Sequence, residues 1–117
     1  MDYSRKPNTD NYQSRIARRT NKGEEMLGRV TSTIVSFDDL LDRSHAVEQW
    51  ITDTKIELTS IYKDETVRGA FQPPIADLIL EKLSHDQVVS VLAEIVSERL
   101  AALAGIVEQT RAQYGKV

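Results

Sequence analysis

The stretch from Ser44 to Tyr62, SHAVEQWITDTKIELTSIY, limits the possible folds more than any other part of the chain. Its apolar residues recur at steps of three and four, which places them on one face of an α-helix. This face comprises Val47, Trp50, Ile51, Thr54, Leu58, Ile61 and Tyr62. The sequence therefore predicts a central amphipathic helix, about 30 Å long at 1.5 Å per residue, with Ser44 as its N-cap.

Trp50 is the only tryptophan of the chain and has two interpretations. As a core anchor it would bury on the order of 200 Å². As an exposed ring it would offer a stacking platform to a ligand or a base. Helical spacing among aliphatic neighbours is typical of a core position, so the first interpretation is favoured.

Helical patterns continue on both sides of this stretch. Before it, an intermittent apolar stripe predicts a helix over about residues 10–31, with Thr9 or Asp10 as cap and a possible break at Gly23. Ser36 followed by Asp39 resembles a capping box and predicts one or two further helical turns. After it, three helices are predicted: a short one over 64–71, one over 75–83 that follows Pro73 and Pro74, and a long one that begins at the Ser84 and Gln87 capping pattern and ends near Gln113.

The sum is an all-α fold, a compact bundle of four or five helices with a long C-terminal helix. A chain of 117 residues supports one such domain. Residues 1–10 are polar and predict a mobile arm, so the domain is expected to span residues 11–117.

The absence of cysteine excludes disulfide scaffolds, thiolate zinc sites and cysteine nucleophiles, and it fits a reducing compartment. The first twenty residues hold no apolar segment of the signal-peptide type. The longest apolar run, Leu100 to Val107, is too short to span a bilayer. We therefore expect a cytosolic protein that does not act in a membrane.

The charge is divided unevenly along the chain. Residues 1–22 hold six basic and two acidic residues, a net charge of +4, whereas the remaining 95 residues carry −7. Arg15, Arg18, Arg19 and Lys22 share one helical face by steps of three and four. This face predicts a contact with nucleic-acid phosphates or with a protein partner. The alternative is a solvated face paired with the acidic body, and the acidic pI of about 5.4 weighs against a DNA-binding domain.

Other residues with catalytic potential have simpler explanations. Asp38, Asp39 and Asp42 form an acidic cluster that suits either Mg²⁺ or the N-terminal dipole of a helix, and the second is favoured. His45 and His85 both fall at predicted helix starts. No glycine-rich phosphate loop and no HExxH zinc pattern occurs. We therefore expect a non-enzymatic protein without a catalytic, metal or cofactor site.

The apolar stripe of the last predicted helix is wider than a coiled-coil seam. Val89, Leu92, Val96, Leu100, Leu103 and Val107 line one face. Val88, Ile95 and Ile106 widen it and predict a second surface, for self-association or for a protein partner.

Residues 20–71 resemble the helical module found ahead of effector domains in some bacterial defence and abortive-infection proteins, including those with TIR-like nucleotide-binding domains. The run Gly23-Glu24-Glu25-Met26-Leu27, the mid-helix Trp50, Leu58 and the terminal Phe71 carry the resemblance. It implies a sensing, docking or oligomerisation module and supplies no catalytic residues. Together these features predict a helical protein-protein interaction or oligomerisation module, and the alternative is a small nucleic-acid-binding regulator that uses the basic helix face.

Overall fold

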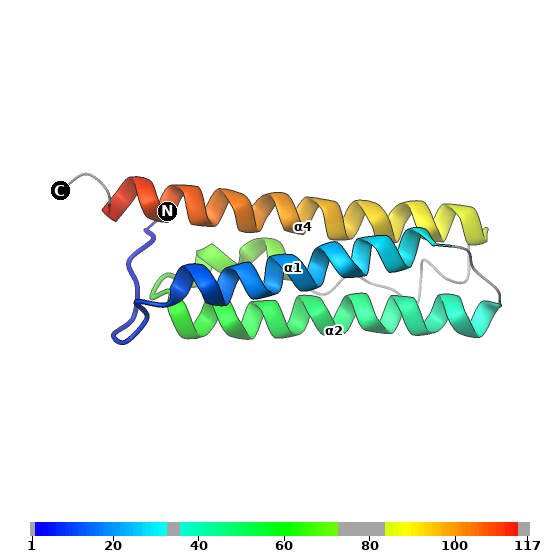
Figure 1. Cartoon of the computed structure of the whole chain (residues 1–117), viewed down its shortest axis with the longest axis horizontal. Helices are drawn as coiled ribbons and strands as arrows, with labels where there is room; N and C mark the ends of the chain where they lie inside the picture. Colours follow the sequence, from blue (N-terminus) through cyan, green and yellow to red (C-terminus); the bar gives the residue numbers. More distant parts are fainter. Residues whose placement is uncertain (1, 33–35, 73–83, 115–117) are drawn as a thin grey trace.

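The structure is a computed structural model that describes residues 2–32, 36–72 and 84–114. The described residues form an all-α bundle in which three long helices lie side by side (Figure 1). They are α1 (Tyr12–Thr31), α2 (Phe37–Ile61) and α4 (His85–Tyr114), and a short 3₁₀-helix, η1 (Glu65–Phe71), packs against α2 and α4. The predicted helix over 75–83 lies outside the described residues.

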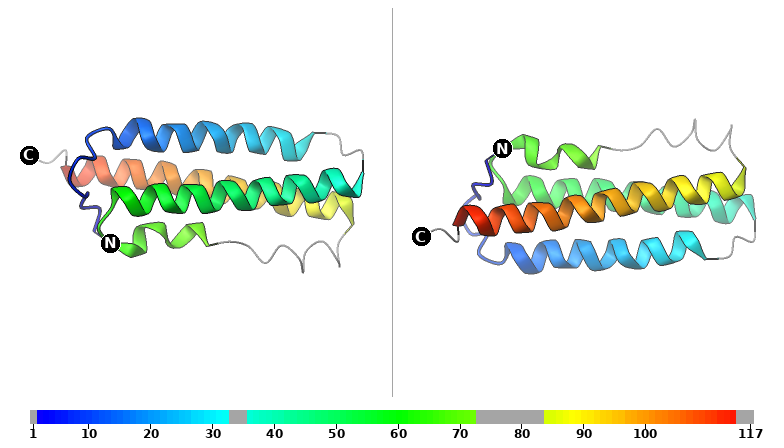
Figure 2. Two further views of the ribbon diagram at one scale, coloured as in Figure 1. Left: turned by 90° about the horizontal axis from the view of Figure 1, so that it is seen from below. Right: turned by 90° about the horizontal axis from the view of Figure 1, so that it is seen from above.

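The chain direction sets which helices run together. α1 is antiparallel to both α2 and α4, which run parallel to each other (Figure 2). At 30 residues α4 is the longest element, about 45 Å at 1.5 Å per residue. Within the described ranges, no helix is long and apolar enough to cross a bilayer.

The predicted apolar face of the central stretch is confirmed. All seven of its residues are buried, and Trp50 is only 2% exposed, so the indole belongs to the core. The helix that carries this face, however, begins at Phe37 and runs without interruption to Ile61. Ser44 is therefore a buried residue inside α2, and the prediction that it caps a separate helix is wrong. Ser36 is the N-cap, and its side chain accepts a hydrogen bond from the Asp39 amide at 3.1 Å.

The start of α4 follows local hydrogen bonds that the sequence indicates, whereas the start of α1 does not. The Ser84 and Gln87 capping box is confirmed, because each side chain accepts a hydrogen bond from the amide of the other residue, at 3.3 and 2.9 Å. α1 ends at Thr31 as predicted, but it begins at Tyr12 after Asn11, whose side chain forms no cap. α1 is also unbroken at Gly23.

The N-terminal segment expected to be a mobile arm is instead tied to the bundle. The Lys6 amide donates to the Ile61 carbonyl at 2.7 Å, and the Lys63 amide donates to the Ser4 carbonyl at 3.0 Å. The Arg5 guanidinium lies 4.4 Å from the ring centre of Tyr12 and 4.8 Å from that of Tyr114, within cation–π range. The segment therefore joins the ends of α1, α2 and α4.

Side-chain hydrogen bonds hold the same region. The Asp2 carboxylate accepts from Ser4 and Gln113, which keeps the pKa of Asp2 below its ordinary value. Deeper in, the hydroxyls of Tyr62 and Thr110 are 2.7 Å apart, and Thr110 also donates to the Ile106 carbonyl at 2.6 Å. Since a threonine hydroxyl has one proton, Tyr62 is the donor of this pair. Burial raises the pKa of the Tyr62 phenol.

Candidate functional site

The basic residues predicted as a contact surface lie along the edge of α1 that faces α2. Arg15 is held there by α2, because its Nε donates to Glu57 Oε1 at 2.7 Å and its Nη2 bonds to Ser60 Oγ. Its side chain therefore joins two helices instead of extending into solvent. Arg18 and Lys22 are exposed, and Arg19 is half-buried.

Arg19 and Lys22 form one wall of a groove between α1 and α2, with a volume of about 250 Å³. Arg29, in the last turn of α1, extends the same wall. The groove is lined by Arg19, Lys22, Met26 and Arg29 from α1 and by Ala46, Gln49, Trp50 and Asp53 from α2. We call it the basic groove.

Charge is unbalanced in the basic groove. Three cationic side chains share the groove lining with one carboxylate, Asp53, which accepts a hydrogen bond from the Gln49 side-chain amide at 2.9 Å. A second carboxylate, Glu25, lies beside Lys22 and Arg29 in an adjoining hollow. Arg29 was not among the predicted contact residues. Its spacing, seven residues after Lys22, would have revealed it, since residues seven apart lie on nearly the same side of a helix.

Trp50 forms part of the floor and fixes the distance between α1 and α2. Its Nε1–H donates to the Arg19 carbonyl at 2.9 Å, and its ring meets Phe71 edge to face at 6.2 Å between centres. The indole lies directly against Gly23, where a β-carbon would be 3.0 Å from Trp50 Cε2 and 2.7 Å from Leu100 Cδ2. Gly23 thus permits a close approach of three helices and is not a weak point of α1.

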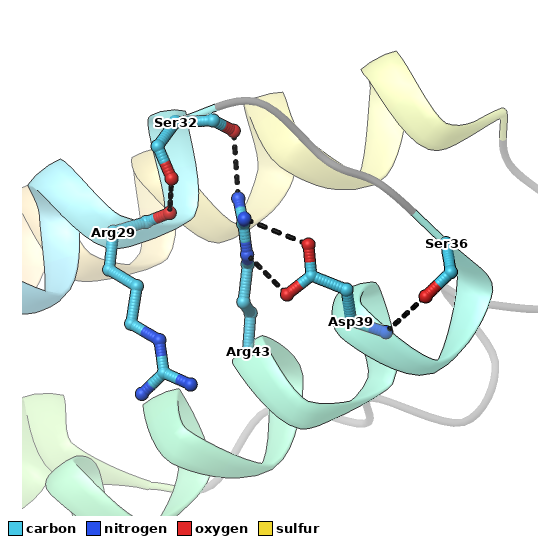
Figure 3. Close-up of polar contacts among 5 residues, drawn as sticks. All are labelled: Arg29, Ser32, Ser36, Asp39 and Arg43. Carbon is cyan, nitrogen blue, oxygen red and sulfur yellow. Dashed lines mark hydrogen bonds and ion pairs between the residues drawn. The ribbon is translucent and has the colours of Figure 1, made fainter.

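A buried arginine closes the end of the bundle beside this groove. Arg43 is 6% exposed, and its guanidinium donates to both carboxylate oxygens of Asp39, at 3.2 and 2.9 Å, and to the Ser32 carbonyl at 2.7 Å (Figure 3). It therefore joins the C-terminal end of α1 to the first turns of α2. Arg29 extends from α1 toward α2 in the same view.

A second and larger groove, of about 580 Å³, lies along the seam between α1 and α4. Its floor is apolar, formed by the buried Ile16 and Leu103 and the half-buried Val107, and the exposed small residues Ala17 and Ala104 form its α1 and α4 walls. Polar side chains surround this floor: Gln13, Thr20, Asn21, Glu108 and Arg111. We call it the apolar groove.

The residues predicted as a self-association face do not form an exposed surface. Val88 and Ile106 are 1% and 6% exposed, and Ile95 is partly buried against the same core. The apolar stripe of α4 is wide because α4 packs against three elements of the same chain: α1, α2 and η1. Any surface that α4 offers to a partner must therefore come from its exposed residues.

The acidic and histidine residues considered for catalysis do not assemble into a metal site. Asp39 holds Arg43. His45 is exposed on α2, and the His85 ring lies 6.3 Å from the ring of Phe37. Across residues 2–32, 36–72 and 84–114, no group of three potential ligands is placed to hold a metal ion.

The fold and the two grooves define this chain as a helical bundle with candidate binding surfaces on either side of α1. No protein-family model matches the chain, and no curated protein and no solved structure is significantly similar to it. The resemblance to modules of bacterial defence proteins and the cytosolic location therefore stay predictions.

Proposed function

We propose that this chain is a non-enzymatic interaction module whose apolar groove receives a short amphipathic helix of a partner protein. The observation that carries the proposal is the groove itself, in which Ala17, Ala104 and the half-buried Val107 present apolar surface between two helices, with polar side chains around it. Grooves of this type are a recurrent way to bind the apolar face of a helix.

The length of the groove favours a helix as its occupant. Its lining residues span 13–21 on α1 and 103–111 on α4, about 12 Å at 1.5 Å per residue. A bound helix places its anchors at i, i+3 or i+4, and i+7, which span about 10.5 Å. A second copy of the chain would need an interface of about 800 Å² per partner, several times the footprint of a groove this short.

Small side chains make close approach possible. Ala17 and Ala104 are exposed on opposite walls, so a helix lying between them can come near the backbones of α1 and α4. The matching ligand is a helix with medium-sized apolar anchors on one face and polar residues on the other.

A displayed library of 12-residue amphipathic peptides tests this proposal. Selected peptides should carry apolar residues at the i, i+3 or i+4, and i+7 positions. They should lose binding to an Ala104→Glu variant and keep it with Ala112→Glu, an exposed alanine of the same helix outside the groove. Failure to enrich any peptide, or equal binding to both variants, contradicts the proposal.

Light scattering separates this proposal from oligomerisation. The chain should remain monomeric at high concentration. A dimer that Ala104→Glu abolishes and Ala112→Glu leaves intact would show that a second copy occupies the groove, and the partner-helix proposal would then give way to an oligomerisation module.

A nucleic-acid-binding regulator is the second candidate, supported by Arg18, Arg19, Lys22 and Arg29 along one edge of α1. Contact with four phosphates would make duplex affinity fall about 100-fold between about 50 and 200 mM salt. An Arg18→Glu/Arg19→Glu variant should abolish such binding. The absence of any binding at low salt would end this candidate.

A further inference from the structure

We propose that the basic groove is a binding site for small amphiphilic anions, in which a carboxylate or phosphate group is attached to a short apolar body. The site lies between α1 and α2, whereas the partner-helix proposal concerns the seam between α1 and α4. The two proposals therefore stand or fall independently.

The α1 wall supplies the part of the site that would hold the anion. Arg19, Lys22 and Arg29 all line the groove, and among the described residues none of their side chains forms an ion pair. Asp53 faces them across the groove, and Glu25 lies beside Lys22 and Arg29 in an adjoining hollow, so three cations stand against two carboxylates and a local surplus of one positive charge remains. Arginine and lysine donors form their strongest hydrogen bonds with carboxylate and phosphate oxygens, so an anion is the ligand that this wall favours.

The floor supplies a place for the apolar body. Met26 on α1 is half-buried, and with Ala46 and the edge of Trp50 it forms a largely apolar surface beneath the cations. A simple inorganic anion would leave this surface in water. An anion with a short aliphatic part would cover it and gain about 25 cal/mol for each Å² of apolar surface removed from water.

The volume of the groove sets the size of the ligand. Since one water occupies about 30 Å³ in the liquid, about 250 Å³ corresponds to roughly eight non-hydrogen atoms. Pockets that enclose larger ligands usually measure about 300–1,000 Å³. A whole nucleotide cofactor is therefore too large, and the 2% exposure of Trp50 leaves no ring face on which a base can stack.

Binding in the basic groove can be followed by NMR through the indole N–H of Trp50. As the only tryptophan it gives one indole N–H resonance in NMR spectra, and this N–H donates to the Arg19 carbonyl at the edge of the groove. Hexanoate and butyl phosphate, which have eight and nine non-hydrogen atoms, are suitable probes. Hexanamide supplies the body without the charge, and inorganic phosphate supplies the charge without the body. All titrations are matched in ionic strength with sodium chloride.

Hexanoate, butyl phosphate or both should shift the indole resonance saturably, and hexanamide and inorganic phosphate should bind more weakly. A saturable response to only one of the two organic anions identifies the headgroup. Absence of saturation with both, or an equal response to hexanamide, overturns the proposal. A response to a short DNA duplex in place of the small anions also overturns it and supports the nucleic-acid candidate.

Three matched substitutions locate the binding. Lys22→Gln and Arg29→Gln should each weaken binding of the responding anion about tenfold, because each removes one charged hydrogen-bond donor. Arg18→Gln removes an exposed cation of the same helix outside the groove and should leave affinity unchanged. All three sites are on the surface, so folding should be retained. Equal effects of the three variants would show a general charge effect and would reject the groove as the site.

Discussion

Replacing Gly23 with alanine should destabilise this protein, although the same change stabilises most helices. In an exposed helix alanine is favoured over glycine by about 1 kcal/mol. In α1 the new β-carbon would lie 2.7 Å from Leu100 Cδ2, 3.0 Å from Trp50 Cε2 and closer still to Trp50 Cζ2. Carbon atoms in ordinary contact are about 3.5–4.0 Å apart, so either α1 and α2 must separate or the indole must turn.

The expected magnitude follows from three contributions. Overpacking a well-filled core costs about 1–3 kcal/mol. Turning the indole also weakens the hydrogen bond from Trp50 Nε1 to the Arg19 carbonyl, which contributes about 1 kcal/mol. The gain in helix propensity offsets about 1 kcal/mol of this loss. The free energy of unfolding should therefore fall by about 1–3 kcal/mol in the Gly23→Ala variant.

Urea denaturation followed by circular dichroism measures this change, and the chain contains a matched control. A β-carbon at Gly28, five residues later in α1, would meet nothing within 4 Å, so Gly28→Ala should raise the free energy of unfolding by about 1 kcal/mol. In a Trp50→Phe background, Gly23→Ala should lose most of its penalty, because only the contact with the flexible end of Leu100 remains. If Gly23→Ala stabilises the protein as Gly28→Ala does, the close packing of Trp50 on α1 is refuted.

Three further predictions concern buried polar groups. Arg43→Met removes the guanidinium that joins Asp39 to α1 and should lower the free energy of unfolding in urea by about 3 kcal/mol; a loss below about 1 kcal/mol would contradict this. Thr110→Val leaves the buried Tyr62 hydroxyl without its acceptor and should cost about 1–3 kcal/mol, part of which a Tyr62→Phe/Thr110→Val double variant should recover. Burial raises the pKa of Tyr62 above its ordinary value of 10.0, so the folded state binds more protons than the unfolded state near and above that pH; the contribution of Tyr62 to stability should be constant below about pH 9 and fall above pH 10, and the Tyr62→Phe variant should lose less stability over this range.

The parts of the fold that were predicted correctly depend on local information. The apolar face of α2 follows from the 3.6-residue period, which is visible without any knowledge of the neighbouring helices. The start of α4 follows from a capping box whose two members are three residues apart. The position of η1 follows from Val67 and Phe71, which are both buried.

The errors in the fold come from contacts between distant residues. Arg43 lies on the buried side of α2, where a charged residue interrupts the apolar pattern, and only its bonds to Asp39 and to the Ser32 carbonyl explain its position. The sequence therefore predicts a new helix start at Ser44, whereas α2 begins seven residues earlier, at Phe37, and continues without a break. The N-terminal segment was predicted to be mobile because the partners that hold it against α2 and α4 lie more than 50 residues away, as for Lys6 with Ile61.

The candidate site was predictable only on its α1 side. The spacing of Arg18, Arg19 and Lys22 places them on one edge of a helix, and that edge does border a groove. No pattern in the sequence shows that Glu57 of α2 binds Arg15 or that Asp53 is the carboxylate facing the remaining cations. Those pairings depend on how α2 is rotated against α1, which Trp50 and Gly23 determine through their contact.

Both grooves have α1 as a wall, and the composition of α1 explains why. Its buried residues, Tyr12, Ile16, Gly23 and Val30, form a single narrow stripe, whereas nine residues of α2 are buried. A helix with a narrow buried stripe leaves its flanks partly uncovered, since α2 and α4 each cover only one side of it. Charge then distinguishes the two flanks: the side toward α2 carries Arg19, Lys22 and Arg29, and the side toward α4 carries Ala17, Thr20 and Asn21. One flank of α1 thus borders a groove that favours anions, and the other borders a groove that favours a partner helix. Substitution of Lys22 in the first groove and of Ala104 in the second should therefore affect different ligands.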